Sequence, residues 1–223
     1  HTCADNNVFI SLWAQWNLSY AAELAGRGEY KAVAGRIGVT GRETDEWHDM
    51  AGKLFIIGPD ANGIIEEFEG YFGLDPDLDG ICETYCAHSQ AVKQPDVLAA
   101  FIPFEDRYPA EIRRKNWHYY NARTLHGSSL SLPGMAYAAA RCGLNDEALH
   151  NLHQSCRMDL DDVNLDTERG VHVSGGAVAW GAVVCGFERS EPRGQRPQIA
   201  PRQRLERHQL EPRLGAVVVA VAC

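Results

Sequence analysis

Apolar side chains near the start of the chain recur every three or four residues, at Phe9, Leu12, Trp13, Trp16, Tyr20 and Leu24. This period places them on one face of an amphipathic helix over residues 8–26, which we expect to end at Gly26 or Gly28. The same pattern predicts further helices over residues 42–54, 90–102, 108–120, 132–142, 145–158 and 172–187. Period-two alternation is confined to 53–57 and 216–221, so strands are expected to be minor. The pattern therefore predicts an all-α chain of antiparallel helix pairs.

Two segments interrupt the helical pattern. Residues 57–69 hold Gly58, Pro59 and Gly63 and read as a long connection, and long connections in compact helical domains usually carry function. From Glu188 onward the composition changes to arginine, glutamine and proline. We therefore expect residues 1–188 to form the folded part and residues 189–223 to form an irregular, poorly packed tail.

The composition of the 223 residues is that of a water-soluble globular domain. The formal net charge of −9 argues against nucleic-acid and anionic membrane partners, which attract basic surfaces. No apolar run reaches the length of a membrane span. The first residues lack the features of a signal peptide, and the absence of a starting methionine suggests a chain cut from something longer.

The seven cysteines are odd in number and have no repeated spacing, which favours reduced thiols in a cytoplasmic enzyme over a disulfide scaffold. Cys82, Cys86 and His88 lie close together in the sequence, as zinc ligands do. A fourth ligand is missing and no second cysteine pair follows, so we expect no metal site.

The stretch from Tyr120 to Ser131 concentrates groups that bind anions. An arginine, a histidine, a glycine and several serines lie directly before an apolar helix, as in loops that hold phosphate at a helix N-terminus. The alternative is an ordinary helix entry, in which Ser128 or Ser131 caps the following helix. These residues alone leave both interpretations open.

Six blocks occur in one order along residues 1–187: DNN (5–7), WNLSYA (16–21), GIIEEFEGYF (63–72), KQPDV (93–97), NWHYYNARTLHGSSLS (116–131) and RMDLDDVNLDTERGVH (157–172). Together they resemble glycoside hydrolase family 65, the maltose, kojibiose and trehalose phosphorylases and their hydrolytic relatives. The resemblance implies an (α/α)6 barrel, the six-hairpin toroid of many glycosidases. We therefore expect this chain to be the C-terminal portion of such a barrel.

The resemblance also implies residue roles. It assigns phosphate binding to His126, Gly127, Ser128, Ser129 and His172, sugar binding to Lys93, Gln94 and Glu66, and supporting roles to Arg123 and Glu168, the latter orienting His172 or Arg123. The family's general acid is a glutamate in a motif that ends at the position of His1, so it is expected just upstream of this chain. Glu67 stands where the family more often has glutamine, a change that either alters acceptor recognition or has no effect.

The expected function is part of an inverting disaccharide phosphorylase, which cleaves an α-glucoside with inorganic phosphate to give β-glucose 1-phosphate. Phosphate is an anionic nucleophile and needs positioning rather than a catalytic base, so no cofactor other than this co-substrate is expected. Two alternatives remain: an inverting α-glucoside hydrolase of the same family, with Glu168 as the one carboxylate suited to act as base, and a noncatalytic carbohydrate-binding remnant. The full-length protein is considered a candidate homodimer.

Overall fold

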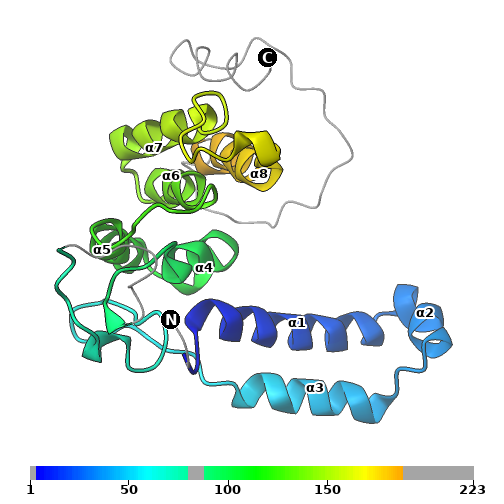
Figure 1. Ribbon diagram of the computed structural model, residues 1–223. Helices are drawn as coiled ribbons and strands as arrows, with labels where there is room; N and C mark the ends of the chain where they lie inside the picture. Colours follow the sequence, from blue (N-terminus) through cyan, green and yellow to red (C-terminus); the bar gives the residue numbers. More distant parts are fainter. Residues whose placement is uncertain (1–3, 80–87, 188–223) are drawn as a thin grey trace. The chain divides into compact units, whose positions relative to one another are not determined.

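The chain divides into two compact units between Leu125 and His126. A computed structural model describes residues 4–79 and 88–187, and Figure 1 traces their helices in sequence order. Each unit has its own helices and its own buried apolar core. His1, the predicted tail 189–223 and the predicted strand 216–221 lie outside the described residues.

The first unit contains α1 (Val8–Gly26), α2 (Lys31–Arg36), α3 (Gly41–Lys53), α4 (Asp96–Phe104) and α5 (Ala110–Asn121). Helices α1 and α3 lie side by side, α1 also packs on α4, and α4 packs on α5 (Figure 1). Single 3-10 turns occur at Gly28–Tyr30, Tyr71–Gly73 and Glu105–Arg107. The starts of α1 and α3 follow local capping chemistry, because Asn7 accepts from the amide of Ile10 and Thr40 forms a capping box with Glu43.

The second unit contains α6 (Ser131–Arg141), α7 (Asn145–Arg157), α8 (Val173–Gly181) and a π-helical segment, Ala182–Phe187. A 3-10 turn, Thr167–Arg169, lies in the connection between α7 and α8. Helix α6 packs against α7, α8 and the π-helical segment, and α7 also packs on α8. The apolar core of this unit includes Met135, Leu152 and Ala179.

Most of the predicted helices are confirmed. The structure corrects the start of one helix, adds one short helix and removes one predicted strand. The helix expected over 90–102 begins only at Asp96, because Val92 pairs with Thr124 in an isolated parallel bridge and Pro95 disfavours helix in the residue before it. The short helix α2 was not predicted. Residues 54–57 follow α3 as loop, so the strand expected over 53–57 is wrong.

The connection between α3 and α4 is pinned to α5 from inside the first unit. The fully buried Asn116 accepts a hydrogen bond from the amide of Ile65 at 2.9 Å and donates to the carbonyl of Gly63 at 2.8 Å. The hydroxyl of Tyr120 donates to the carbonyl of Ile65 at 2.6 Å. These satisfied buried hydrogen bonds fix the loop backbone against α5.

The part of the chain that the structure describes contains no named strand, only two isolated bridges. Within those same residues, no helix combines the length and the apolar character that crossing a bilayer demands. The all-α fold class predicted from the hydrophobic pattern is confirmed.

Candidate functional site

The loop that enters α6 carries four of the predicted phosphate-binding residues. His126 has a left-handed backbone, with φ of 55°, and its Nδ1 lies 2.8 Å from the hydroxyl of Ser131, the first residue of α6. Ser128 turns the loop, because its carbonyl accepts from the amide of Ser131 and its hydroxyl accepts from the amide of Leu130. Burial lowers the pKa of His126. Because Nδ1 already contacts Ser131, Nε2 is the ring nitrogen that can bind a ligand.

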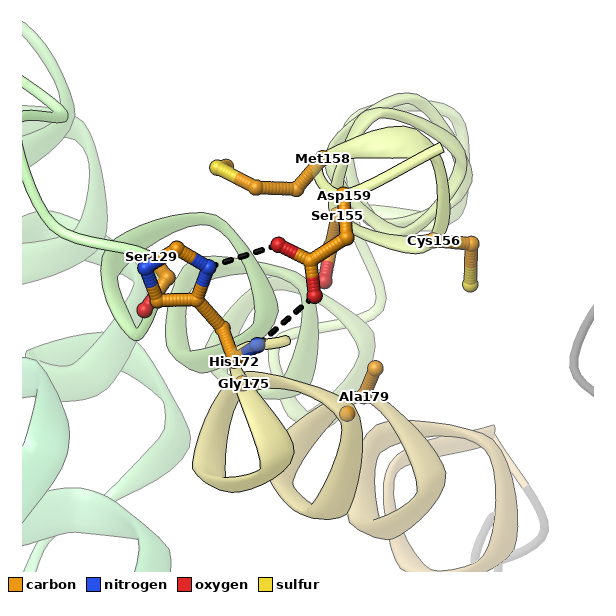
Figure 2. Close-up of a pocket in the computed structure, with 9 residues that line it drawn as sticks. Ser129, Ser155, Cys156, Met158, Asp159, His172, Gly175 and Ala179 are labelled. Atoms are coloured by element: carbon orange, nitrogen blue, oxygen red, sulfur yellow. Dashed lines mark hydrogen bonds and ion pairs between the residues drawn. The ribbon is translucent and has the colours of Figure 1, made fainter. Parts of the chain in front are cut away.

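His172 occupies the N-cap position of α8 and is held by the carboxylate of Asp159. One carboxylate oxygen lies 2.6 Å from the ring Nδ1 of His172, and the other accepts from the backbone amide of the same residue at 2.7 Å (Figure 2). The ring Nε2 lies 3.4 Å from a carboxylate oxygen of Asp166. The hydrogen bond from Asp159 raises the pKa of His172, and the same bond lowers the pKa of Asp159.

A cavity of about 130 Å³ opens between the α6 entry loop, the end of α7 and the start of α8. Its lining residues, most of them labelled in Figure 2, are Ser129, Ser155, Cys156, Met158, Asp159, His172, Gly175, Gly176 and Ala179. The loop and α8 approach closely because position 175 is glycine: a Cβ there would lie 3.0 Å from the carbonyl oxygen of Ser129. A larger residue would force the two walls of the cavity apart.

The cavity brings together two of the five predicted phosphate-binding residues, Ser129 and His172. His126, Gly127 and Ser128 belong to the same loop as Ser129 but are not among the residues that line it. Sequence reasoning did not assign Asp159 a role, although Asp159 stands in one of the recognised blocks. A spacing of thirteen residues between Asp159 and His172 gives no sign of contact until the connection folds back.

The predicted sugar-binding residues lie in the first unit. Lys93 and Gln94 are exposed and directly follow Val92, whose main chain pairs with the segment 123–125. The half-buried Glu66 accepts a hydrogen bond from the amide of Phe72 at 2.9 Å, so one of its oxygens already shapes the loop.

The two residues predicted to support the site have different surroundings. The guanidinium of Arg123 lies 3.7 Å from the ring centre of Tyr119, and its Nε donates to the side chain of Gln90. Glu168 is exposed. The orienting role of Glu168 toward His172 or Arg123 stays a prediction, and the carboxylates found beside the His172 ring are those of Asp159 and Asp166.

Glu67, which stands where the family more often has glutamine, is buried. Only 6% of the residue is exposed, its Oε1 accepts from the amide of Asp96, and its Oε2 has no hydrogen-bond partner among the described residues. Loss of hydration, together with the nearby carboxylate of Asp96, raises the pKa of Glu67 to about 8. Asp96 itself accepts from the side chain of Asn7 at 2.8 Å, so the three residues join α1, the loop and α4.

Two of the residues considered for a metal site, Cys82 and Cys86, lie outside the described residues. Within ranges 4–79 and 88–187, no group of three or more histidine, cysteine, aspartate or glutamate side chains is arranged to hold a metal ion.

Comparison with known families gives a match over residues 1–181 to the central catalytic domain of glycosyl hydrolase family 65. Among curated proteins, the chain is 30% identical to 1,2-alpha-glucosylglycerol phosphorylase of Bacillus selenitireducens, over 91% of this chain and 30% of that protein. It is 27% identical to kojibiose phosphorylase of Caldanaerobacter subterraneus, over 84% of this chain and 27% of the relative. Maltose phosphorylase of Bacillus subtilis is 29% identical over 88% of this chain and 28% of its own length.

A solved structure, a putative kojibiose phosphorylase from the human microbiome, superposes with a TM-score of 0.71 at 25% sequence identity, covering 82% of this chain and 26% of that one. The chain thus spans about 30% or less of the length of the relatives described. The expected fold, an all-α portion of an (α/α)6 barrel, agrees with this neighbour, and the resemblance stated from the six sequence blocks is confirmed.

Proposed function

Because the chain belongs to glycosyl hydrolase family 65, we propose that it forms the phosphate-binding part of an inverting disaccharide phosphorylase. The reaction cleaves an α-glucoside with inorganic phosphate and gives β-glucose 1-phosphate. Suitable substrates are α-glucosides of the kinds for which the relatives are named, such as kojibiose, maltose or glucosylglycerol. Phosphate is the co-substrate, and a cytoplasmic location and a homodimeric full-length protein stay predictions.

The observation that carries this proposal is the shared cavity of Ser129 and His172. A serine hydroxyl and a protonated imidazole both donate hydrogen bonds, and they meet beside the N-terminus of α8, where the helix dipole favours an anion. A phosphorolytic site needs such positioned donors, because phosphate brings its own nucleophilic oxygen.

The cavity favours phosphorolysis over the hydrolytic alternative. An inverting hydrolase needs a carboxylate that accepts a proton from water. Asp159 is the carboxylate among the described residues that line the cavity, and both of its oxygens accept hydrogen bonds from His172. Glu168, the earlier candidate for a base, is exposed and is not part of the lining.

Calorimetric titration of the chain with inorganic phosphate tests the binding part of the proposal. We expect saturable binding that Ser129→Ala weakens, whereas Ser174→Ala, which removes an exposed hydroxyl outside the cavity lining, leaves it unchanged. Absence of binding, or equal effects of the two substitutions, would refute the assignment of the cavity.

Activity is tested with the protein that carries this chain together with the segment preceding His1, since the general acid is expected there. Kojibiose, maltose, trehalose and glucosylglycerol are each supplied with and without phosphate, and the configuration of the released sugar is read by proton NMR. Phosphate-dependent formation of β-glucose 1-phosphate supports the proposal. Glucose release at the same rate in phosphate-free buffer would favour the hydrolase.

A further inference from the structure

Both oxygens of the Asp159 carboxylate bind the same residue, His172. One oxygen accepts from the backbone amide at 2.7 Å, and the other lies 2.6 Å from Nδ1 of the ring. The pKa of Asp159 is lowered by these bonds, so the carboxylate is ionised and can only accept. The proton of this contact therefore sits on Nδ1, and the ring has one fixed orientation (Figure 2).

Among the described residues that line the cavity, His172 is the one side chain that can carry a positive charge. It does so at an unfavourable place, because the N-terminus of α8 repels a cation. Asp159 offsets this repulsion by stabilising the imidazolium. Asp166 also raises the pKa of His172, but Asp159 has the largest effect, so its loss weakens the positive charge of the cavity and removes the orientation of its strongest donor.

We propose that Asp159 is a positioning residue for anion binding, which holds His172 as an imidazolium with Nδ1–H on its own carboxylate and Nε2–H directed to an incoming phosphate oxygen. This inference rests on the proposed function, in which the cavity takes phosphate. No proton leaves the pair during binding: Nε2–H donates to the anion, and Nδ1–H stays with Asp159.

Asp166 sits on the opposite side of the ring and acts differently. Its carboxylate oxygen lies 3.4 Å from Nε2, the nitrogen that the phosphate would engage. An entering anion must therefore replace Asp166 at this position, against the repulsion of its negative charge. The remaining titratable side chain that lines the cavity is the thiol of Cys156 on α7, whose pKa is raised by burial and which therefore stays neutral.

The two aspartates give a matched pair of substitutions. Asp159→Asn and Asp166→Asn each remove one negative charge beside His172, so a purely electrostatic effect would make both variants bind anions more tightly. The proposal predicts opposite results. Asp159→Asn weakens binding because His172 loses its orientation and the largest support for its proton. Asp166→Asn removes a smaller support for the proton but also removes the competitor at Nε2–H, so binding stays equal or becomes tighter.

The experiment measures inorganic sulfate binding by calorimetry between pH 5.5 and pH 8, because sulfate keeps a constant charge across this range. For Asp159→Asn we expect up to about tenfold weaker binding at pH 8 for each unit by which the pKa of His172 falls, and a far smaller loss at pH 5.5, where acid favours the imidazolium in both proteins. An equal loss at both pH values, or unchanged binding at pH 8, would overturn the proposal. Recovery of binding at low pH also shows that the variant is folded.

A second readout separates this inference from the proposed function. The proton and carbon resonances of the His172 ring are titrated by NMR without any anion, and the midpoint is expected to fall more in Asp159→Asn than in Asp166→Asn. The wild-type chain could bind neither phosphate nor sulfate while the His172 midpoint still falls more in Asp159→Asn than in Asp166→Asn. In that case the proposed function is refuted, but the interaction of Asp159 with His172 is supported. An unmoved midpoint in Asp159→Asn overturns the inference itself.

Discussion

Replacing Glu67 with glutamine removes a buried acid while keeping the shape of the side chain. In the folded chain the residue is 6% exposed, and the pKa of its carboxyl is raised from the ordinary 4.5 to about 8. In the unfolded chain the group returns to its ordinary value. Folding therefore favours the protonated acid, and the penalty for keeping Glu67 buried grows as the pH rises from about 4.5 to about 8.

The size of this penalty follows from the two pKa values. A difference of about 3.5, at about 1.4 kcal/mol for each unit, corresponds to about 5 kcal/mol, which is an upper value because water that enters the loop would relieve part of it. The contribution has a definite sign. It is absent below pH 4.5, where both states are protonated, and it is fully developed above pH 8. Glu67→Gln should therefore be nearly neutral in acid and stabilising by several kcal/mol at alkaline pH.

Urea unfolding followed by tryptophan fluorescence measures this difference. Four of the five tryptophans, at positions 13, 16, 47 and 117, lie in the same unit as Glu67, so the signal reports mainly on that unit. Glu111→Gln is the control, because the side chain of Glu111 is 77% exposed and its removal should leave the pH dependence almost unchanged. Parallel stability curves for Glu67→Gln and wild type from pH 4.5 to pH 8.5 would show the reasoning to be wrong.

Four further substitutions, one of them a control, test the packing, hydrogen bonding and capping described above, each by chemical denaturation. Gly175→Ala should lower the free energy of unfolding by about 1–2 kcal/mol, because the new Cβ lies 3.0 Å from the carbonyl oxygen of Ser129. Gly176→Ala is the control, because a Cβ there has open space and should be neutral or slightly stabilising. Equal effects of the two substitutions would argue against the close approach. Asn116→Ala should cost about 2–4 kcal/mol, since it leaves buried loop amide and carbonyl groups unpaired, and a loss under 1 kcal/mol would contradict that role. Thr40→Ala should cost about 1 kcal/mol through loss of the capping box, and an unchanged midpoint would count against the cap.

The sequence predicted the helices well wherever local signals agreed. Helix α1 was predicted over residues 8–26, with an end at Gly26 or Gly28, and is observed at Val8–Gly26, because a three-to-four residue period runs up to a glycine. The start of α4 was missed, since apolar residues before Pro95 continue a helical period while their main chain pairs with a distant segment. Such pairing depends on tertiary contact, which a local pattern does not contain.

The candidate site was predicted in part for the same reason. Ser129 and His172 were found from the residue types and the family resemblance, and the structure places both on one cavity. The contact between Asp159 and His172 was not predicted, because the family resemblance pointed to Glu168 as the residue that orients His172 or Arg123. Only the fold of the connection between α7 and α8 decides which carboxylate reaches the ring. The burial of Glu67 likewise comes from packing that brings α4 against its loop.

Carboxylates accept several of the hydrogen bonds that hold the connection between α7 and α8, which makes this segment sensitive to acid. Asp162 accepts from the amides of Asp166 and Thr167, and Asp159 accepts from the amide of His172. The pKa values of both acceptors are lowered, so the stabilisation they give is present above their ordinary values and is lost as the pH falls. Acidification should therefore open this connection locally, with rapid deuterium uptake at these three amides while the flanking helices remain protected.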